Sequence, residues 1–81
     1  MVTVTVYGAD GCWKCANTIK ALDLAGIEHR YRDVPAEGLA DELRDQGVRE
    51  LPLVVTDTGE RWTGLRLDKI VELSRLRAAT A

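Results

Sequence analysis

Hydrophobic and polar positions alternate in the first segment of the chain, where valines at positions 2, 4 and 6 are separated by threonines. A period of two is typical of a β-strand, and β-branched residues favour the same structure. Shorter apolar runs repeat this signal further along the chain. The predicted strands cover residues 2–7, 29–33, 53–55 and 61–63. The alternation in the second strand places Tyr31 on its inward face, and the turn-forming residues 57–60 join the last two strands into a hairpin.

Three other segments carry apolar residues at the spacing of an α-helix. The predicted helices cover residues 15–25, 35–46 and 67–77. Gly26 and Gly47 follow the first two helices, and glycine is common where a helix ends. Pro35 suits the first turn of the second helix, because proline has no N–H to leave unpaired there. The elements therefore follow the order β-α-β-α-β-β-α.

This order predicts an α/β fold, because strands that alternate with helices favour a sheet with right-handed crossovers. The final hairpin makes the expected sheet mixed, with four strands and three helices. The chain has 81 residues, which is enough for one small hydrophobic core. We therefore expect a single domain that covers residues 1–81.

Charge and hydropathy narrow the possible functions. The chain carries 11 Lys and Arg residues against 13 Asp and Glu residues, which gives no electrostatic argument for nucleic-acid binding. No apolar run approaches the roughly 20 residues that cross a bilayer. The first residues lack the basic segment of a signal peptide. We therefore expect a cytoplasmic monomer that binds neither nucleic acid nor a membrane.

The candidate chemistry lies in Cys12 and Cys15, the only two cysteines, which are spaced as C-x-x-C. They follow the first predicted strand and stand at the start of the first predicted helix. A helix N-terminus favours thiolate over thiol, because unpaired N–H groups and the positive end of the helix dipole face the sulfur. We therefore interpret Cys12 as the nucleophile and Cys15 as the resolving thiol. Lys14 adds a positive charge that favours the thiolate further. Trp13 is expected to be exposed at the tip of the turn, where an aromatic side chain suits protein recognition.

Other uses of the cysteine pair remain open. Structural zinc usually takes four ligands, but the chain offers two cysteines and one histidine, His29, so a zinc site would need a carboxylate or a second chain. An iron–sulfur cluster shared between two copies is a non-enzymatic alternative, since two chains supply four thiolates. A structural disulfide is a third alternative, although in a reducing cytosol a C-x-x-C pair is more often catalytic or metal-binding.

The order of elements, the C-x-x-C after the first strand and Leu51–Pro52 before the third resemble the thioredoxin fold in its minimal, glutaredoxin-like form. This resemblance implies that Pro52 is cis and lies close to the C-x-x-C. Proline is the residue for which a cis bond costs little, and its missing N–H leaves the Leu51 backbone free to pair with an incoming peptide.

A second block, Trp62-Thr63-Gly64-Leu65-Arg66-Leu67-Asp68, resembles the W-S/T-G-F-R-P-D block of NrdH-type redoxins, with leucine in place of Phe and Pro. The resemblance covers nearly the whole chain. It implies a dithiol–disulfide oxidoreductase that takes electrons from thioredoxin reductase and delivers them to ribonucleotide reductase. No bound cofactor is implied, because the redox-active disulfide Cys12–Cys15 carries the electrons. The residues expected to bind a partner are Trp13, Lys14, Leu51, Pro52, Trp62, Thr63, Gly64 and Arg66.

Several residues depart from the patterns of these families. Trp13-Lys14 replaces the usual x-Gln pair between the cysteines. Ala9 stands where glutathione-using glutaredoxins have a lysine that holds the tripeptide, Asp10 adds a negative charge, and Thr63-Gly64-Leu65 replaces a double glycine. These changes disfavour an anionic ligand, so we expect a protein reductant, with a glutathione-dependent glutaredoxin as the alternative.

Overall fold

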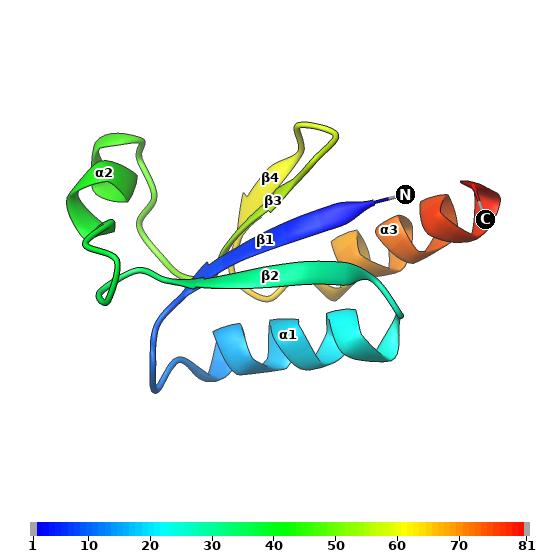
Figure 1. Ribbon diagram of the computed structural model, residues 1–81, viewed down its shortest axis with the longest axis horizontal. Coiled ribbons are helices and arrows are strands. Elements are labelled where there is room, and N and C mark those ends of the chain that lie inside the picture. Colours follow the sequence, from blue (N-terminus) through cyan, green and yellow to red (C-terminus); the bar gives the residue numbers. More distant parts are fainter. Residues whose placement is uncertain (1, 81) are drawn as a thin grey trace.

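The computed structural model describes residues 2–80, so the two ends of the predicted domain, residues 1 and 81, lie outside the described part of the chain (Figure 1). The order of the elements is the predicted one. They are β1 (Thr3–Gly8), α1 (Trp13–Leu24), β2 (Glu28–Asp33), α2 (Ala40–Asp45), β3 (Leu53–Thr56), β4 (Arg61–Thr63) and α3 (Leu67–Thr80). The main differences in bounds are that α1 begins two residues earlier than predicted, α2 begins five residues later and α3 ends three residues later.

The four strands form one mixed sheet in the order β2-β1-β3-β4. β1 and β2 are parallel, since α1 returns the chain between them, whereas β3 is antiparallel to β1 and β4 is antiparallel to β3. At the centre of the sheet, Val6 pairs with Tyr31 on one side and with Val54 on the other. The predicted fold class, a four-stranded mixed sheet with three helices, is therefore confirmed.

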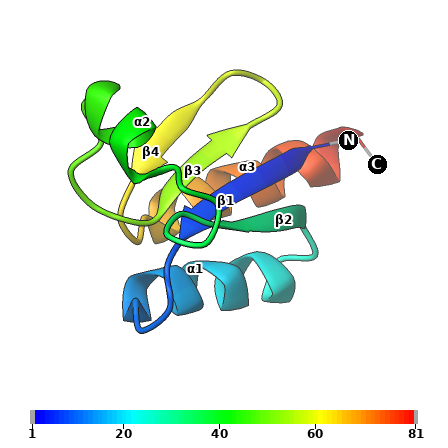
Figure 2. The same ribbon diagram turned by 60° about the vertical axis from the view of Figure 1, so that its left-hand side comes forward.

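The main core lies between one face of the sheet and the pair α1 and α3, which lie together on that side in both views (Figures 1 and 2). Alternate positions of the strands point into it. The side chains of this core with no exposed surface include Val4, Val6, Leu22 and Val54. Trp62, Ile70 and Leu73 are also buried, with at most 7% of their surface exposed. The period-two pattern of β1 is therefore confirmed. The broad apolar face expected of α3 is confirmed only for Ile70 and Leu73, because Leu67, Val71 and Leu76 are exposed.

A smaller core lies on the opposite face, where α2 packs against the end of the sheet and Leu43 contacts Leu53 and Val34. The prediction of a helix from residue 35 was wrong. Residues 34–38 form turns, and Gly38 has a φ of +66°, a conformation that a right-handed helix does not contain. The α2 helix therefore begins at Ala40.

Tyr31 lies on the α1 side of the sheet, as predicted, since it pairs with Val6 and borders a hollow with residues of α1, but 44% of its surface is exposed. β2 is an edge strand, and the α1–α3 layer is centred on the inner strands. The Tyr31 ring lies near the end of β1, against Gly8.

Within residues 2–80, no helix has both the length and the apolar character needed to cross a membrane.

Candidate active site

The two cysteines lie at the start of α1, directly after the loop that follows β1. Cys12 is the N-cap residue of α1, with extended backbone angles, and its sulfur accepts a hydrogen bond from the Cys15 N–H at 3.2 Å. The two side chains form a disulfide, and their Cα atoms are 5.2 Å apart. The C-x-x-C therefore lies at a helix N-terminus, as predicted, and the sulfur of Cys12 takes the place of a capping oxygen.

The two sulfurs differ in their surroundings. Cys12 is half-buried, whereas only 2% of the surface of Cys15 is exposed. Cys15 packs against Gly8, where a Cβ atom would lie 3.0 Å from the Cys15 sulfur. Glycine at the end of β1 therefore provides the space for the second cysteine. A substrate sulfur can approach Cys12, while Cys15 is held behind it.

The loop before β3 lies beside Cys12. The Leu51–Pro52 peptide bond is cis, as the family resemblance implied, and the Leu51 carbonyl oxygen is 3.9 Å from the Cys12 sulfur. The N–H of Gly64 donates to the Pro52 carbonyl oxygen at 2.9 Å. These contacts bring together the active-site turn, the Pro52 loop and the segment after β4. We use the name dithiol groove for the surface that these three segments share around Cys12. Leu51 is half-buried there, whereas Pro52 and Gly64 are buried beneath it.

The residues between the cysteines face outward on this groove. Trp13 is 64% exposed, as predicted. The Lys14 ammonium lies 5.8 Å from the centre of the Trp13 ring and 3.4 Å from the Glu50 carboxylate. The positive charge beside the cysteines is therefore already paired with a carboxylate of the Pro52 loop.

The residues of the Trp62–Asp68 block occupy different positions. Trp62 is buried in the main core, so it is an anchor of the hairpin and not a surface contact. Thr63 lies beside Glu50, with its hydroxyl 3.5 Å from the carboxylate. Arg66 donates to Asp68 through Nε and Nη2, at 3.1 and 2.9 Å. This hydrogen bonding lowers the pKa of the Asp68 carboxyl and raises that of the Arg66 guanidinium. Arg66 therefore forms a loop-fixing ion pair at the start of α3.

Three residues at the site were not among the predicted site residues. Gly8 has no side chain and so leaves the space that Cys15 occupies. Tyr31 borders a hollow of about 250 Å³ beside both cysteines, and burial, followed by the charges of Asp33 and Asp10, raises the pKa of its hydroxyl. Glu50 pairs with Lys14. Its position directly before Leu51–Pro52 was a signal that it lies near the C-x-x-C, because the family resemblance places Pro52 there, but no pattern indicated its contact with Lys14.

The metal alternative can be compared with the described residues. Among residues 2–80, no group of three or more His, Cys, Asp or Glu side chains is arranged to hold a metal ion. His29 lies on β2, with its ring Nδ1 2.9 Å from the Ile27 carbonyl oxygen and its Nε2 3.3 Å from Asp23. A zinc site within one copy therefore has no ligand set in this part of the chain.

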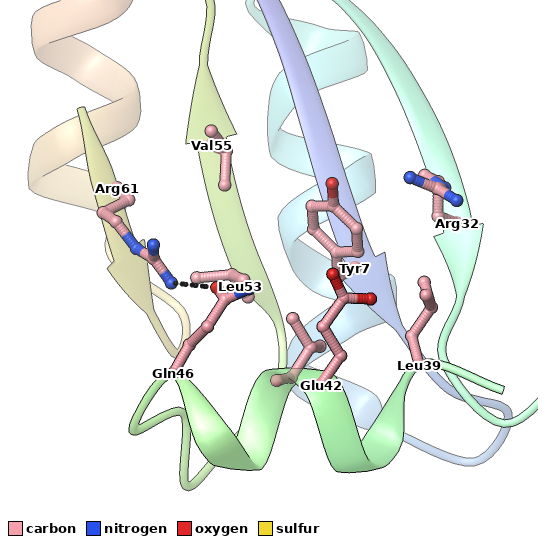
Figure 3. Close-up of a pocket in the computed structure, with 9 residues that line it drawn as sticks. Tyr7, Arg32, Leu39, Glu42, Gln46, Leu53, Val55 and Arg61 are labelled. Carbon is pink, nitrogen blue, oxygen red and sulfur yellow. Dashed lines mark hydrogen bonds between the residues drawn. The ribbon is translucent and has the colours of Figure 1, made fainter. Parts of the chain in front are cut away.

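A separate pocket of about 240 Å³ lies between α2 and the sheet (Figure 3). Tyr7, Glu42 and Gln46 line it between two arginines from opposite edges, and Figure 3 shows Arg61 donating to Gln46, at 3.3 Å. Arg32 at the other edge is held by Glu37 and lies 5.5 Å from the centre of the Tyr7 ring. The pocket includes neither cysteine and none of the predicted site residues.

Comparisons with known proteins agree with this geometry. A model of the glutaredoxin family matches residues 4–60. A glutaredoxin-like protein NrdH from Salmonella typhimurium is 34% identical to this chain over 73 residues, which cover 89% of each chain. The relatedness therefore extends through the cysteine pair, the Pro52 loop and the hairpin.

Solved structures show the same likeness in three dimensions. The NrdH-redoxin of Escherichia coli superposes with a TM-score of 0.80 at 32% identity, over 88% of this chain and 93% of that one. Its structure has been described as the basis of a thioredoxin-like activity profile. A glutaredoxin from Archaeoglobus fulgidus superposes with a TM-score of 0.71 at 22% identity, over 93% and 88% of the two chains, which shows a shared fold.

Proposed function

Since this chain belongs to the glutaredoxin family, and within it to the NrdH-type redoxins, which are thiol–disulfide oxidoreductases, we propose that it passes electrons from thioredoxin reductase to a protein disulfide, that of ribonucleotide reductase. One observation carries the proposed roles of the cysteines. Cys12 is half-buried at the N-terminus of α1, and Cys15 is buried directly behind it. This arrangement supports an outer sulfur that attacks and an inner sulfur that resolves.

The first step consumes the reduced form of the protein. The Cys12 thiolate attacks one sulfur of the partner's disulfide, the partner's S–S bond breaks, and one partner sulfur leaves as a thiolate that takes up a proton. A mixed disulfide now joins Cys12 to the partner. The N-terminus of α1, including the N–H of Cys15, stabilises the attacking thiolate before this step.

The second step releases the partner. Cys15 loses its proton and attacks the Cys12 sulfur, so the Cys12–Cys15 bond forms while the mixed disulfide breaks. The second partner sulfur leaves as a thiolate, and two electrons have passed to the partner. This step would leave the Cys12–Cys15 disulfide, which is the form of the two cysteines in this structure. Thioredoxin reductase then restores the dithiol, and the chain needs no bound cofactor because its own sulfurs hold the electrons.

The dithiol groove is proposed as the binding surface for the partner. Trp13 and Lys14 form one wall, Leu51 lies opposite with the buried Pro52 behind it, and the segment that contains the buried Gly64 closes the third side. Because proline has no N–H and Leu51 precedes it in a loop, the Leu51 backbone can pair with an extended segment of the partner. Thr63 and the Arg66–Asp68 pair hold the third wall in place, with Trp62 anchored below it. We propose that the protein works as a monomer in the cytoplasm.

Trapping tests the cysteine roles and the identity of the partner. In Cys15→Ser the second step cannot occur, so Cys12 should remain joined to the partner protein through a disulfide that dithiothreitol releases. Ribonucleotide reductase is the expected captured protein, as identified by mass spectrometry. Cys12→Ser is the matched control and should capture nothing. Capture by Cys12→Ser but not by Cys15→Ser would exchange the two roles.

A coupled assay tests the electron donor. We expect disulfide reduction when the protein is combined with NADPH and thioredoxin reductase, and little when it is combined with NADPH, glutathione and glutathione reductase. The negative charge of Asp10, beside the two cysteines, supports this preference, because glutathione is an anion. Activity with glutathione alone would make the chain a glutathione-dependent glutaredoxin.

A further inference from the structure

The carboxylate of Glu50 lies where the three segments of the dithiol groove meet. Glu50 precedes the Pro52 loop, its Oε2 is 3.4 Å from the Lys14 ammonium of the active-site turn, and its Oε1 is 3.5 Å from the Thr63 hydroxyl after β4. No pattern in the sequence predicts the contact between Lys14 and Glu50, because these two residues are 36 positions apart. The charge between the cysteines is thus balanced by a residue from another part of the chain.

The same carboxylate covers Gly64. A Cβ atom at Gly64 would lie 3.4 Å from Glu50 Oε1 and 3.5 Å from Oε2. The N–H of Gly64 already donates to the Pro52 carbonyl oxygen at 2.9 Å. A ligand that reaches this wall of the groove therefore meets a carboxylate, and the Gly64 N–H is engaged within the protein.

We propose that Glu50 is a specificity-determining residue, which cancels the charge of Lys14 and so prevents the dithiol groove from attracting anionic disulfides. The inference rests on the proposed function, because it concerns the substrates that Cys12 attacks. With Glu50 in place, Lys14 and Glu50 present a locally neutral pair beside the reacting sulfur. Without Glu50, the groove presents one unpaired ammonium.

The surrounding charges support this assignment. Arg66 is paired with Asp68, and Asp10 stands on the Tyr31 side of the cysteines. Arg49 lines a pocket on the α2 side of the Pro52 loop, which Glu50 and Leu51 also border and Lys14 does not. The Lys14–Glu50 pair itself is 40% and 51% exposed, and exposed pairs contribute little to stability. Removing one partner should therefore change the charge of the groove while leaving the fold intact.

Three small disulfides that differ in charge test the proposal. They are 3,3′-dithiodipropionate, which is anionic, cystamine, which is cationic, and bis(2-hydroxyethyl) disulfide, which is neutral. Each is reduced to two thiols while Cys12 and Cys15 become a disulfide, so electrons balance without another reagent. The measured quantity is the rate constant for oxidation of the reduced protein at low ionic strength.

The expected result is a shift of preference towards the anionic disulfide. One unpaired unit charge at contact distance in water changes a rate by about fivefold. Glu50→Gln should therefore raise the anionic rate and lower the cationic rate, so that their ratio rises by about 10- to 25-fold. Lys14→Met should lower the same ratio, and Lys14→Met/Glu50→Gln should return it close to the wild-type value. Added salt should shrink all these differences.

The matched controls separate charge from structure. Glu60→Gln makes the same charge change in the turn between β3 and β4, away from the groove, and should leave the ratio within about twofold of the wild type. Glu50→Asp keeps the charge and should also keep the ratio. If Glu50→Gln changes all three rates by one common factor, Glu50 acts only through loop position or thiolate fraction, and the proposal is overturned. Failure of the wild type to react with the neutral disulfide would instead overturn the proposed function.

Discussion

Glycine at position 8 allows two side chains to meet behind the active-site turn. A Cβ atom there would lie 2.9 Å from Tyr31 Cε1, 3.0 Å from the Cys15 sulfur and 3.1 Å from the Cys15 Cβ. Contacts this short force neighbouring groups to move. Gly8, which the sequence analysis did not assign to the site, is therefore part of the support for Cys15.

Gly8→Ala should consequently destabilise the oxidised protein by about 1–3 kcal/mol, because a methyl group is forced into a filled space. Urea unfolding measures the loss. The effect should be smaller when Gly8→Ala is introduced into Tyr31→Ser, since the truncated side chain removes the contact at 2.9 Å. Equal losses in both backgrounds would show that Tyr31 does not restrict this position.

Trp62 illustrates a buried residue with an unpaired polar group. It lies in the main core, and its Nε1 has no hydrogen-bond partner among the residues that the structure describes. A buried donor without a partner lowers stability, which offsets part of the packing that the indole ring provides. Removing the donor and part of the ring together should therefore cost less than an ordinary truncation in the core.

We expect Trp62→Phe to lower the free energy of unfolding by less than about 1.5 kcal/mol. Leu73→Ala, in the same core, should lower it by about 2–5 kcal/mol. Both are measured by urea unfolding of the oxidised protein. The interpretation of the indole N–H is wrong if Trp62→Phe is as destabilising as Leu73→Ala.

At the scale of elements, the start of α3 depends on an ion pair within a short stretch of sequence. Asp68 lies in the first turn of α3, where a negative charge is favourable, and Arg66 donates to it through two nitrogens. The hydrogen bond from Arg66 is the main cause that lowers the Asp68 pKa from its ordinary value of 3.8. The folded state therefore binds the Asp68 proton less tightly than the unfolded state does.

The lowered pKa of Asp68 determines how the stability of the fold changes with pH. A carboxyl whose folded-state pKa is lowered stabilises the fold at pH values above about 4, and this contribution disappears as the pH falls through the folded-state pKa. Arg66→Met should raise the Asp68 pKa towards 3.8, as measured by NMR titration of the carboxyl carbon. Arg75→Met, on a later turn of α3, should leave it unchanged. An ordinary Asp68 pKa in the wild type would contradict the assignment of this pair.

The elements that could be predicted from the sequence are those whose signal is local. The alternation of β1 and the turn residues 57–60 each occupy a few consecutive positions, and both predictions are confirmed by the strand pairing. The start of α2 was missed, because a leucine and a proline near residues 35–39 fit a helix until the backbone of Gly38 is known. The exposure of Tyr31 was missed since alternation says which residues share a face but not how far a helix layer extends over it.

At the scale of the whole molecule, the site is made where segments distant in sequence meet. The cysteine pair could be identified from spacing alone, and the cis bond at Pro52 from the family resemblance. The Lys14–Glu50 pair and the packing of Cys15 on Gly8 could not, because both depend on how the Pro52 loop and β1 approach α1 in space. Sequence thus located the cysteine pair, while the fold determines the charges and surfaces around it.

The exposed side chains beside Cys12 should affect the binding of a protein substrate more than they affect the reactivity of the Cys12 sulfur. Trp13 is next to Cys12 and is among the most exposed large hydrophobic side chains of the described residues. Exposed tryptophans at the centre of an interface often contribute more than 1–2 kcal/mol to binding. Trp13→Ala should therefore lower kcat/KM for a protein disulfide such as insulin by about 5- to 30-fold. The rate with bis(2-hydroxyethyl) disulfide should change by less than about twofold, because a small substrate reaches Cys12 without the indole.

Leu24 offers the matched control for this prediction. It is 81% exposed at the far end of the same helix, so Leu24→Ala removes a comparable exposed apolar side chain without touching the dithiol groove. Leu24→Ala should leave both rates unchanged. If Trp13→Ala slows the protein and the small disulfide by the same factor, the indole acts on the reactivity of Cys12. If it slows neither, the partner binds the groove without Trp13, and the wall opposite the Pro52 loop is not part of the interface.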